Sequence, residues 1–128
     1  MKVFLTGASG ALGRMALNVL LARGHRLTLL CRPRSGELAR HRSSIAGNGL
    51  IRVPGDLLGT DRWGAALEGQ EVVLHLAGVT HASRREDYFR VNTRGTRLLS
   101  AEAARRGVRR LVYVSTRAVG AACGAYGE

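Results

Sequence analysis

The sequence predicts an α/β fold, a doubly wound parallel sheet with the strand order 3-2-1-4-5. Its strand-like runs are apolar throughout and are separated by helical or polar segments, as is typical of a parallel sheet covered by helices on both faces. A glycine-rich turn joins the first run to an apolar helical pattern. With right-handed crossovers, this order leaves a ligand-binding crevice between the first and fourth strands. We expect residues 7–13 and 77–81 to form its floor and rim.

The first half of the chain supplies three strands. Apolar residues at helical spacing follow the first strand, and Gly24 ends that helix. Pro33, Ser35 and Gly36 end the second strand, and a weak polar helix comes before the third. The predicted strands are Lys2–Thr6, Arg26–Cys31 and 50–53, and the predicted helices are 12–22 and 36–42.

The second half continues the alternation of strands and helices. A helix of one or two turns is predicted at 61–67 and a fourth strand at 71–77. Helical spacing of apolar residues predicts one long helix over 88–106, which Gly107 ends. A fifth strand is predicted at 110–116. Glycines then mark an irregular tail.

Length and composition indicate one domain. The chain has 128 residues, of which 45% are hydrophobic and 23% charged, enough for one core but not for a second lobe. No apolar run approaches the roughly 20 residues of a membrane span, and no signal-peptide pattern is present, so we expect a cytoplasmic protein. Cys31 and Cys123 lack metal-site or disulfide spacing, so we interpret both as free thiols and expect no metal.

The net charge of +11 raises the question of nucleic acid. The few aromatic residues are scattered, and no nucleic-acid-binding motif accompanies the arginines. We therefore expect no nucleic-acid partner, and a bias toward arginine over lysine is the alternative explanation. Residues 23–52 hold seven arginines and one acid, Glu37, and this local excess favours an anionic ligand nearby.

The turn Gly7-Ala8-Ser9-Gly10-Ala11-Leu12-Gly13 predicts a dinucleotide site. Gly7 permits the tight turn, Gly10 lets a pyrophosphate approach the backbone, and Gly13 lets the helix pack close to the strand. Free N–H groups at the start of the helix attract phosphate. A purely structural glycine turn is the alternative.

The end of the second strand predicts NADP(H) rather than NAD(H). An acidic residue there would bind the adenosine ribose hydroxyls, but the chain has Cys31 followed by Arg32 and Arg34. The two guanidinium groups can pair with a 2′-phosphate. Alternatively, both are ordinary surface arginines, and NAD remains an option.

Five motifs in order now carry a resemblance to a known family. They are Thr6-Gly7-x-x-Gly10-x-x-Gly13, Gly55-Asp56-Leu57, His75-Leu76-Ala77-Gly78, Asn92-x-x-Gly95-Thr96 and Val112-Tyr113-Val114-Ser115-Thr116. Together they resemble the amino-terminal Rossmann portion of the extended short-chain dehydrogenase/reductase family. These proteins are NAD(P)-dependent epimerases and dehydratases that act mostly on nucleotide sugars.

The resemblance implies a set of cofactor contacts. Asp56 resembles the aspartate beside the adenine amino group, although it could instead cap a turn. Asn92 resembles a helix asparagine near the cofactor, although it could bond only to neighbouring backbone, and we expect His75 to be a packed strand residue. The expected cofactor-binding residues are Gly7, Ser9, Gly10, Ala11, Leu12, Gly13, Arg32, Arg34, Asp56, Leu57, Leu76, Ala77, Gly78, Asn92 and Val114.

The resemblance also implies catalytic residues. In the family a Ser or Thr after the fifth strand binds the substrate oxygen, and a Tyr exchanges its proton. A Lys four residues later lowers the pKa of that Tyr toward neutrality. Thr116, with Ser115 adjacent, matches the first position, and Tyr126 matches the Tyr unless it is only a tail residue. The Lys would stand at position 130, two residues past the last, so catalysis is not implied by this stretch alone.

Residues 1–128 thus predict a dinucleotide-binding domain that stops before the later strands and the substrate lobe. The function implied is hydride transfer between nicotinamide and a carbinol or carbonyl carbon, and the alternative is a non-catalytic dinucleotide-binding or regulatory module. The fifth strand would be a bare apolar edge. We expect either the front part of a longer enzyme or self-association through that edge.

Overall fold

Five parallel strands form one sheet in a computed structural model that describes residues 1–32 and 49–116. The order is β3-β2-β1-β4-β5, which confirms the prediction. In chain order the strands are β1 (Lys2–Thr6), β2 (Arg26–Cys31), β3 (Leu50–Pro54), β4 (Val72–His75) and β5 (Arg110–Tyr113). The switch in direction lies between β1 and β4, where the register places Thr6 opposite His75.

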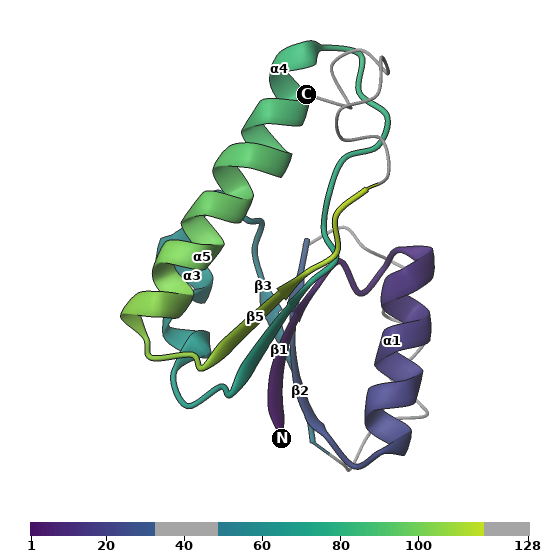
Figure 1. The fold of residues 1–128 in the computed structure, drawn as a ribbon, viewed down its shortest axis with the longest axis vertical. Coiled ribbons are helices and arrows are strands. Elements are labelled where there is room, and N and C mark those ends of the chain that lie inside the picture. Colours follow the sequence, from purple (N-terminus) through teal and green to yellow (C-terminus); the bar gives the residue numbers. More distant parts are fainter. Residues whose placement is uncertain (33–48, 117–128) are drawn as a thin grey trace.

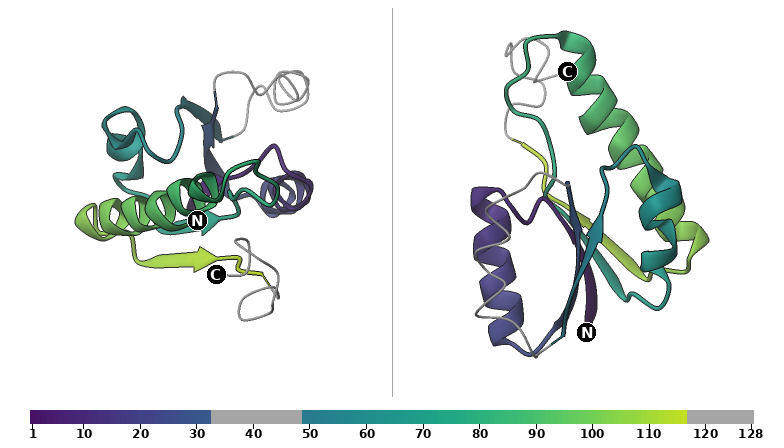
Figure 2. Two further views of the ribbon diagram at one scale, coloured as in Figure 1. Left: turned by 90° about the horizontal axis from the view of Figure 1, so that it is seen from above. Right: turned by 180° about the vertical axis from the view of Figure 1, so that it is seen from behind.

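Helices cover both faces of the sheet (Figures 1 and 2). Helix α1 (Ala11–Ala22) lies on one face, and α3 (Thr60–Trp63) and α5 (Thr96–Arg105) lie on the other. Alternate residues of β1 enter separate cores: Val3 and Leu5 pack with the α1 side, and Phe4 packs with the α3 and α5 side. The helix predicted at 36–42 lies outside the described residues.

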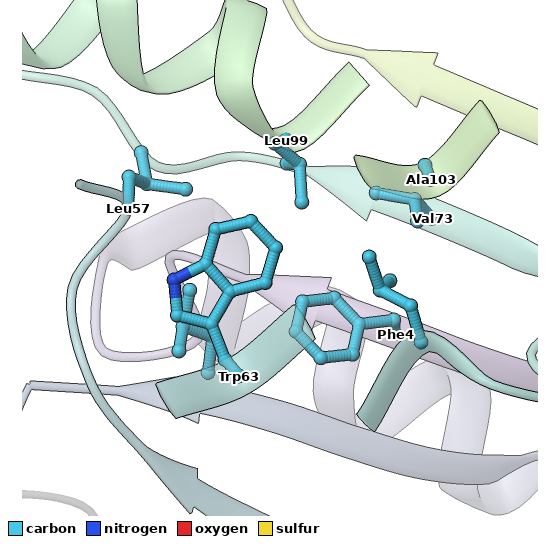
Figure 3. Close-up of a cluster of buried hydrophobic side chains, with 8 residues drawn as sticks. Phe4, Leu57, Trp63, Val73, Leu99 and Ala103 are labelled. Carbon is cyan, nitrogen blue, oxygen red and sulfur yellow. The ribbon is translucent and has the colours of Figure 1, made fainter. Parts of the chain in front are cut away.

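The core on the α5 face also fixes the segment that follows β3 (Figure 3). Trp63 is completely buried, and its ring centroid lies 6.2 Å from that of Phe4. Leu57 joins the same cluster. The indole Nε1 of Trp63 donates a hydrogen bond of 2.7 Å to the carbonyl oxygen of Asp56. Core packing therefore helps to hold the turn after β3.

The predicted long helix is wrong in detail. The chain forms α4 (Arg85–Tyr88), then a π-helical segment η2 (Phe89–Gly95), and only then α5. The helix predicted at 61–67 is α3 followed by a 3₁₀ turn, η1 (Gly64–Leu67). A sequence periodicity of 3.6 does not distinguish these tighter or wider turns from an α-helix.

Strands β4 and β5 are shorter than predicted, and β5 forms an exposed edge. After β4 the chain turns away from regular pairing, because the amide of Ala77 donates to the side chain of Thr6 instead of to a strand carbonyl. Along β5, Val112 and Tyr113 are 40% and 46% exposed, and Val114 just beyond it is 44% exposed. None of the helices in residues 1–32 and 49–116 is long and apolar enough to cross a membrane.

Candidate functional site

The turn between β1 and α1 contains two glycines at positions where the backbone leaves no room for a Cβ. Gly7 has a φ of +76°, and a Cβ there would lie 2.6 Å from the backbone nitrogen of Ala77. A Cβ on Gly13 would lie 2.0 Å from the carbonyl oxygen of Gly7. Both distances are far below van der Waals contact, so the turn and the close approach of α1 to β1 require glycine at both positions.

Gly10, in contrast, has no packing reason to be glycine. A Cβ there would meet only the carbonyl oxygen of Gly7, at 3.4 Å, and Gly10 lines a cavity. Gly10 is the N-cap of α1, no side chain caps that end, and the first turn contains no acid. Ala11 and Leu12 are exposed at the start of the helix. The N–H groups at the start of α1 have no partner within the helix, so they can donate hydrogen bonds to an anionic group such as a phosphate.

The larger cavity, of about 420 Å³, brings most of the predicted cofactor residues together. It spans the switch point between β1 and β4 that the strand order predicts. Its lining includes residues from the ends of β1, β2, β3 and β4. The predicted residues among them are Gly7, Ser9, Gly10, Arg32, Asp56, Leu57, Leu76, Ala77 and Gly78.

Asp56 has a turn-capping role as well as a place in this cavity. Its Oδ1 accepts a 2.8 Å hydrogen bond from the amide of Leu58, which is the capping alternative considered for it. The residue is exposed and lines the cavity, and its carbonyl oxygen is bound by Trp63. The cap and the indole together fix the direction of the carboxylate at the cavity rim.

At the end of β2, Arg32 is exposed and lines the larger cavity beside Cys31. Burial raises the pKa of the Cys31 thiol, an effect that the nearby Arg52 partly opposes. Cys31 is therefore a neutral thiol rather than a thiolate, in keeping with its interpretation as a free cysteine. Arg34 and Cys123 lie outside the described residues.

A second cavity, of about 260 Å³, adjoins the first. The predicted catalytic residues Ser115 and Thr116 line it, together with Val114 and Leu12. Tyr126 lies outside the described residues. Tyr88, Phe89 and Tyr113 also line this cavity, so aromatic and polar residues share its wall.

The segment Leu76–Val79 lines both cavities and so forms the ridge between them. Asn92 in η2 holds its far end: the amide of Val79 donates to Oδ1 at 2.7 Å, and Nδ2 donates to the carbonyl oxygen of Val79 at 2.9 Å. Asn92 therefore bonds to backbone, as the alternative for it supposed, but to backbone 13 residues away. It also lines the second cavity.

His75 is a packed strand residue, as expected, and it is completely buried. Burial lowers the pKa of its ring from 6.5 to about 4, so the ring is neutral near pH 7. Both ring nitrogens nevertheless have partners, Thr6 Oγ1 and Thr96 Oγ1. No group of three or more metal-ligating side chains occurs in residues 1–32 and 49–116.

Several cavity residues were not predicted from the sequence. Thr6, Cys31, Arg90 and Val91 line the larger cavity, and Tyr88 and Phe89 line the second. Arg90, which pairs with Asp87 at 3.1 Å, adds a second guanidinium beside the larger cavity. Val79, one residue beyond the quoted motif, lines both cavities and falls in the segment 77–81 that was expected at the crevice. Thr6 stands in the first quoted motif, which was the signal available for it.

Known proteins share this architecture. A model of the NAD dependent epimerase/dehydratase family matches residues 3–127. Sterol demethylase protein B of Methylococcus capsulatus is 37% identical over 91% of this chain and 34% of its own length. The 4-hydroxy-2-methyl-3-oxo-4-farnesyl-3,4-dihydroquinoline-1-oxide ketoreductase of Stigmatella aurantiaca is 33% identical over 93% of this chain and 34% of its own.

A solved structure of a short-chain dehydrogenase/reductase superfamily protein from Agrobacterium tumefaciens, with bound NAD, is similar as well. It is 29% identical, with a TM-score of 0.75, over 93% of this chain and 34% of that one. The chain thus spans about a third of the length of these relatives. From the family match and the glycine turn that accompanies it, we conclude that the chain belongs to the NAD-dependent epimerase/dehydratase family.

Proposed function

We propose that this chain binds a nicotinamide dinucleotide and forms the cofactor-binding part of an oxidoreductase, epimerase or dehydratase. The observation that carries the proposal is Gly10, a cavity-lining glycine whose Cβ would meet no tight contact within the protein. A residue that is small without a packing reason leaves room for a ligand. When bound, the nicotinamide would donate or accept the hydride.

The chain's own residues would orient the two ends of the ligand. Amides in the first turn of α1 would bind the pyrophosphate, and Asp56 would meet the adenine at the far side of the larger cavity. Ser115 and Thr116 line the second cavity, where a hydroxyl can donate a hydrogen bond to a substrate carbonyl oxygen. Tyr126 is proposed as the acid or base of that step.

A titration of NADPH into the 128-residue chain, followed by nicotinamide fluorescence, tests the binding. We expect saturable binding that Gly10→Ala weakens at least about tenfold, with little change in thermal stability. Gly24→Ala is the matched control, because Gly24 has a φ of +74° and no atom within 4 Å of a Cβ. It should cost stability and leave binding intact. Absence of binding to the wild-type chain would overturn the proposal.

We further propose that the cofactor is NADP(H). Arg32 supports this preference, because it is exposed at the cavity rim and no acid ends β2. Arg32→Ala should weaken NADPH binding about tenfold and leave NADH binding nearly unchanged. Arg26→Ala, an exposed arginine at the opposite end of the same strand, is the control. Equal or tighter binding of NADH by the wild-type chain would reverse this assignment.

For the substrate we propose a ketone or secondary alcohol on an apolar skeleton, ahead of the nucleotide sugar that the family resemblance implies. Two observations favour it: the three aromatic residues in the lining of the second cavity, and the ketoreductase among the relatives. NADPH oxidation with an alkyl 3-oxo ester should be faster than NADP⁺ reduction with a UDP-sugar, whose secondary alcohols give up hydride to the oxidised cofactor. Turnover of the sugar alone would reverse the order. Binding without any turnover would favour the non-catalytic dinucleotide-binding module.

The exposed edge of β5 leads to a proposal about assembly. Among residues 1–32 and 49–116 no strand pairs with the outer edge of β5, where Val112 and Tyr113 leave apolar surface exposed, and such edges recruit a further strand. We propose that the 128-residue chain self-associates through β5, unless further residues of a longer protein pair with it. Sedimentation should show dimers that Val112→Lys disperses. A soluble wild-type monomer would contradict this.

A further inference from the structure

The segment Leu76–Val79 is a shared wall of the two cavities, and the residue before it is buried and hydrogen-bonded on both ring nitrogens. His75 ends β4, opposite Thr6 of β1 on one side and Tyr113 of β5 on the other. Its ring stacks on that of Tyr113, with centroids 5.2 Å apart and an interplanar angle of 27°. A purely packing residue at this place would need no polar partners.

The hydrogen bonds of Thr6 indicate which ring nitrogen holds the proton. The amide of Ala77 can only donate, and it donates to Thr6 Oγ1 at 3.3 Å. The hydroxyl proton of Thr6 is then available for Nδ1 of His75, 2.6 Å away. With Nδ1 as acceptor, a neutral ring holds its proton on Nε2 and donates it to Thr96 Oγ1 at 2.8 Å. In this arrangement both ring nitrogens and the hydroxyl of Thr6 are paired, and Thr96 Oγ1 acts as the acceptor.

The helical segment that follows holds the other end of the same wall. Asn92 binds the backbone of Val79, and Thr96, four residues later and so on the same helical face, binds His75. Gly95 between them lets Leu57 approach, since a Cβ there would lie 3.0 Å from the Cβ of Leu57. One face of this helix thus contacts the segments after both β3 and β4.

We infer that neutral His75, with its proton on Nε2, is a positioning residue of the site: through Thr6 and Thr96 it fixes the wall Leu76–Val79 that separates the two cavities. His75 touches neither cavity itself, so it acts through the backbone of Ala77. The part of this inference that concerns cofactor affinity rests on the proposed function. The part that concerns the wall does not.

Nitrogen NMR of the ligand-free 128-residue chain tests the tautomer directly. We expect the ring of His75 to show a protonated Nε2 and an unprotonated Nδ1 at neutral pH. The opposite tautomer, or a doubly protonated ring, would overturn the assignment. This measurement needs no variant and no ligand, so it stands even if substitutions at this buried site prevent folding.

Amide hydrogen exchange in variants tests the positioning role. His75→Phe keeps a ring but removes both hydrogen bonds, and we expect exchange at Ala77 to quicken about tenfold or more. His75→Asn retains an acceptor near the position of Nδ1 and should restore part of that protection. Val73→Ala is the matched control, because it is completely buried in the same strand but touches neither Thr6 nor Thr96 by hydrogen bond. Equal loosening at Ala77 in Val73→Ala and His75→Phe would show a merely structural role and overturn the inference.

Cofactor titrations of the same variants separate this inference from the proposed function. His75→Phe should raise the dissociation constant for NADPH about tenfold. Val73→Ala, measured at a temperature below its melting point, should change that constant by less than about twofold. If the wild-type chain binds no dinucleotide while the exchange and tautomer results hold, the proposed function fails and the positioning role stands. If binding is intact and insensitive to His75→Phe, the positioning role fails alone.

Discussion

The predicted ligand crevice has two walls that touch each other, the glycine turn 7–13 on the β1 side and the segment Leu76–Val79 on the β4 side. Different interactions hold them in place. The glycine turn on the β1 side has almost no side chains to hold it, and its shape follows from backbone contacts that exclude a Cβ at Gly7 and Gly13. The wall on the β4 side is held by side-chain hydrogen bonds from His75 and Asn92. The walls meet where a Cβ on Gly7 would lie 2.6 Å from the backbone of Leu76 and Ala77.

The difference bears on what each wall can tolerate. A wall shaped by steric exclusion fails when an atom is added, because backbone cannot move aside cheaply. A wall shaped by hydrogen bonds fails when an atom is removed or its proton state changes, because a buried donor or acceptor then loses its partner. Substitutions that add and remove atoms should therefore separate the two walls.

The largest effect is expected from adding one methyl group to the glycine wall. Gly13→Ala places a Cβ 2.0 Å from the carbonyl oxygen of Gly7, and relieving that overlap requires α1 to move off β1. We expect a loss of at least about 3 kcal/mol in the free energy of unfolding, measured by urea denaturation.

Gly24→Ala calibrates this result. It adds the same methyl group at a positive φ but into open space, and should cost only about 1 kcal/mol. Equal losses in the two variants would mean that backbone conformation, rather than steric exclusion between α1 and β1, explains the glycine wall.

A smaller effect, on the β4 wall, comes from pH. Because burial lowers the pKa of His75 from 6.5 to about 4, the unfolded chain binds a proton there between those values and the folded chain does not. The free energy of unfolding should therefore fall as pH is lowered, by about 2 kcal/mol between pH 7 and pH 5. The groups that face the ring are the hydroxyls of Thr6 and Thr96 and the ring of Tyr113.

Substitution identifies the source of that pH dependence. His75→Gln should be less stable at pH 7 and lose most of the fall toward pH 5, whereas His81→Gln, at an exposed position, should keep it. A wild-type fall that survives His75→Gln unchanged would assign the proton uptake to other residues.

The same contrast explains which parts of the site the sequence could predict. The glycine turn is local, so the spacing of Gly7, Gly10 and Gly13 predicts it directly. The strand order followed from the alternation of strands and helices, and the cavity residues after β3 and β4 followed from the family resemblance. The contacts of His75 join residues 69 and 21 positions apart. They exist only because the strand register places Thr6 opposite His75, and a histidine in an apolar run gives no sign of such partners.

The π-helical segment was hidden for a related reason. The apolar pattern around Val91 and Leu99 fits a continuous helix, and both residues do pack on the same core. A change in hydrogen-bond spacing leaves that pattern nearly intact. The wider turn contains Asn92, which lines the second cavity and bonds to Val79. Its place near the cofactor stays a prediction.

The smallest predicted effect compares one side chain from each wall. Asn92→Ala removes both hydrogen bonds to Val79 and leaves a partly buried amide and carbonyl unpaired, which should cost about 1.5 kcal/mol. Arg14→Ala removes the guanidinium that donates to the carbonyl oxygen of Ser9 at 3.1 Å in the glycine turn, and should cost less than about 1 kcal/mol because the turn keeps its steric constraints. Urea denaturation ranks the two variants, and amide exchange should loosen at Val79 only in the first. A larger loss for Arg14→Ala would mean that the glycine turn, too, depends on a side chain, and the contrast between the walls would then fail.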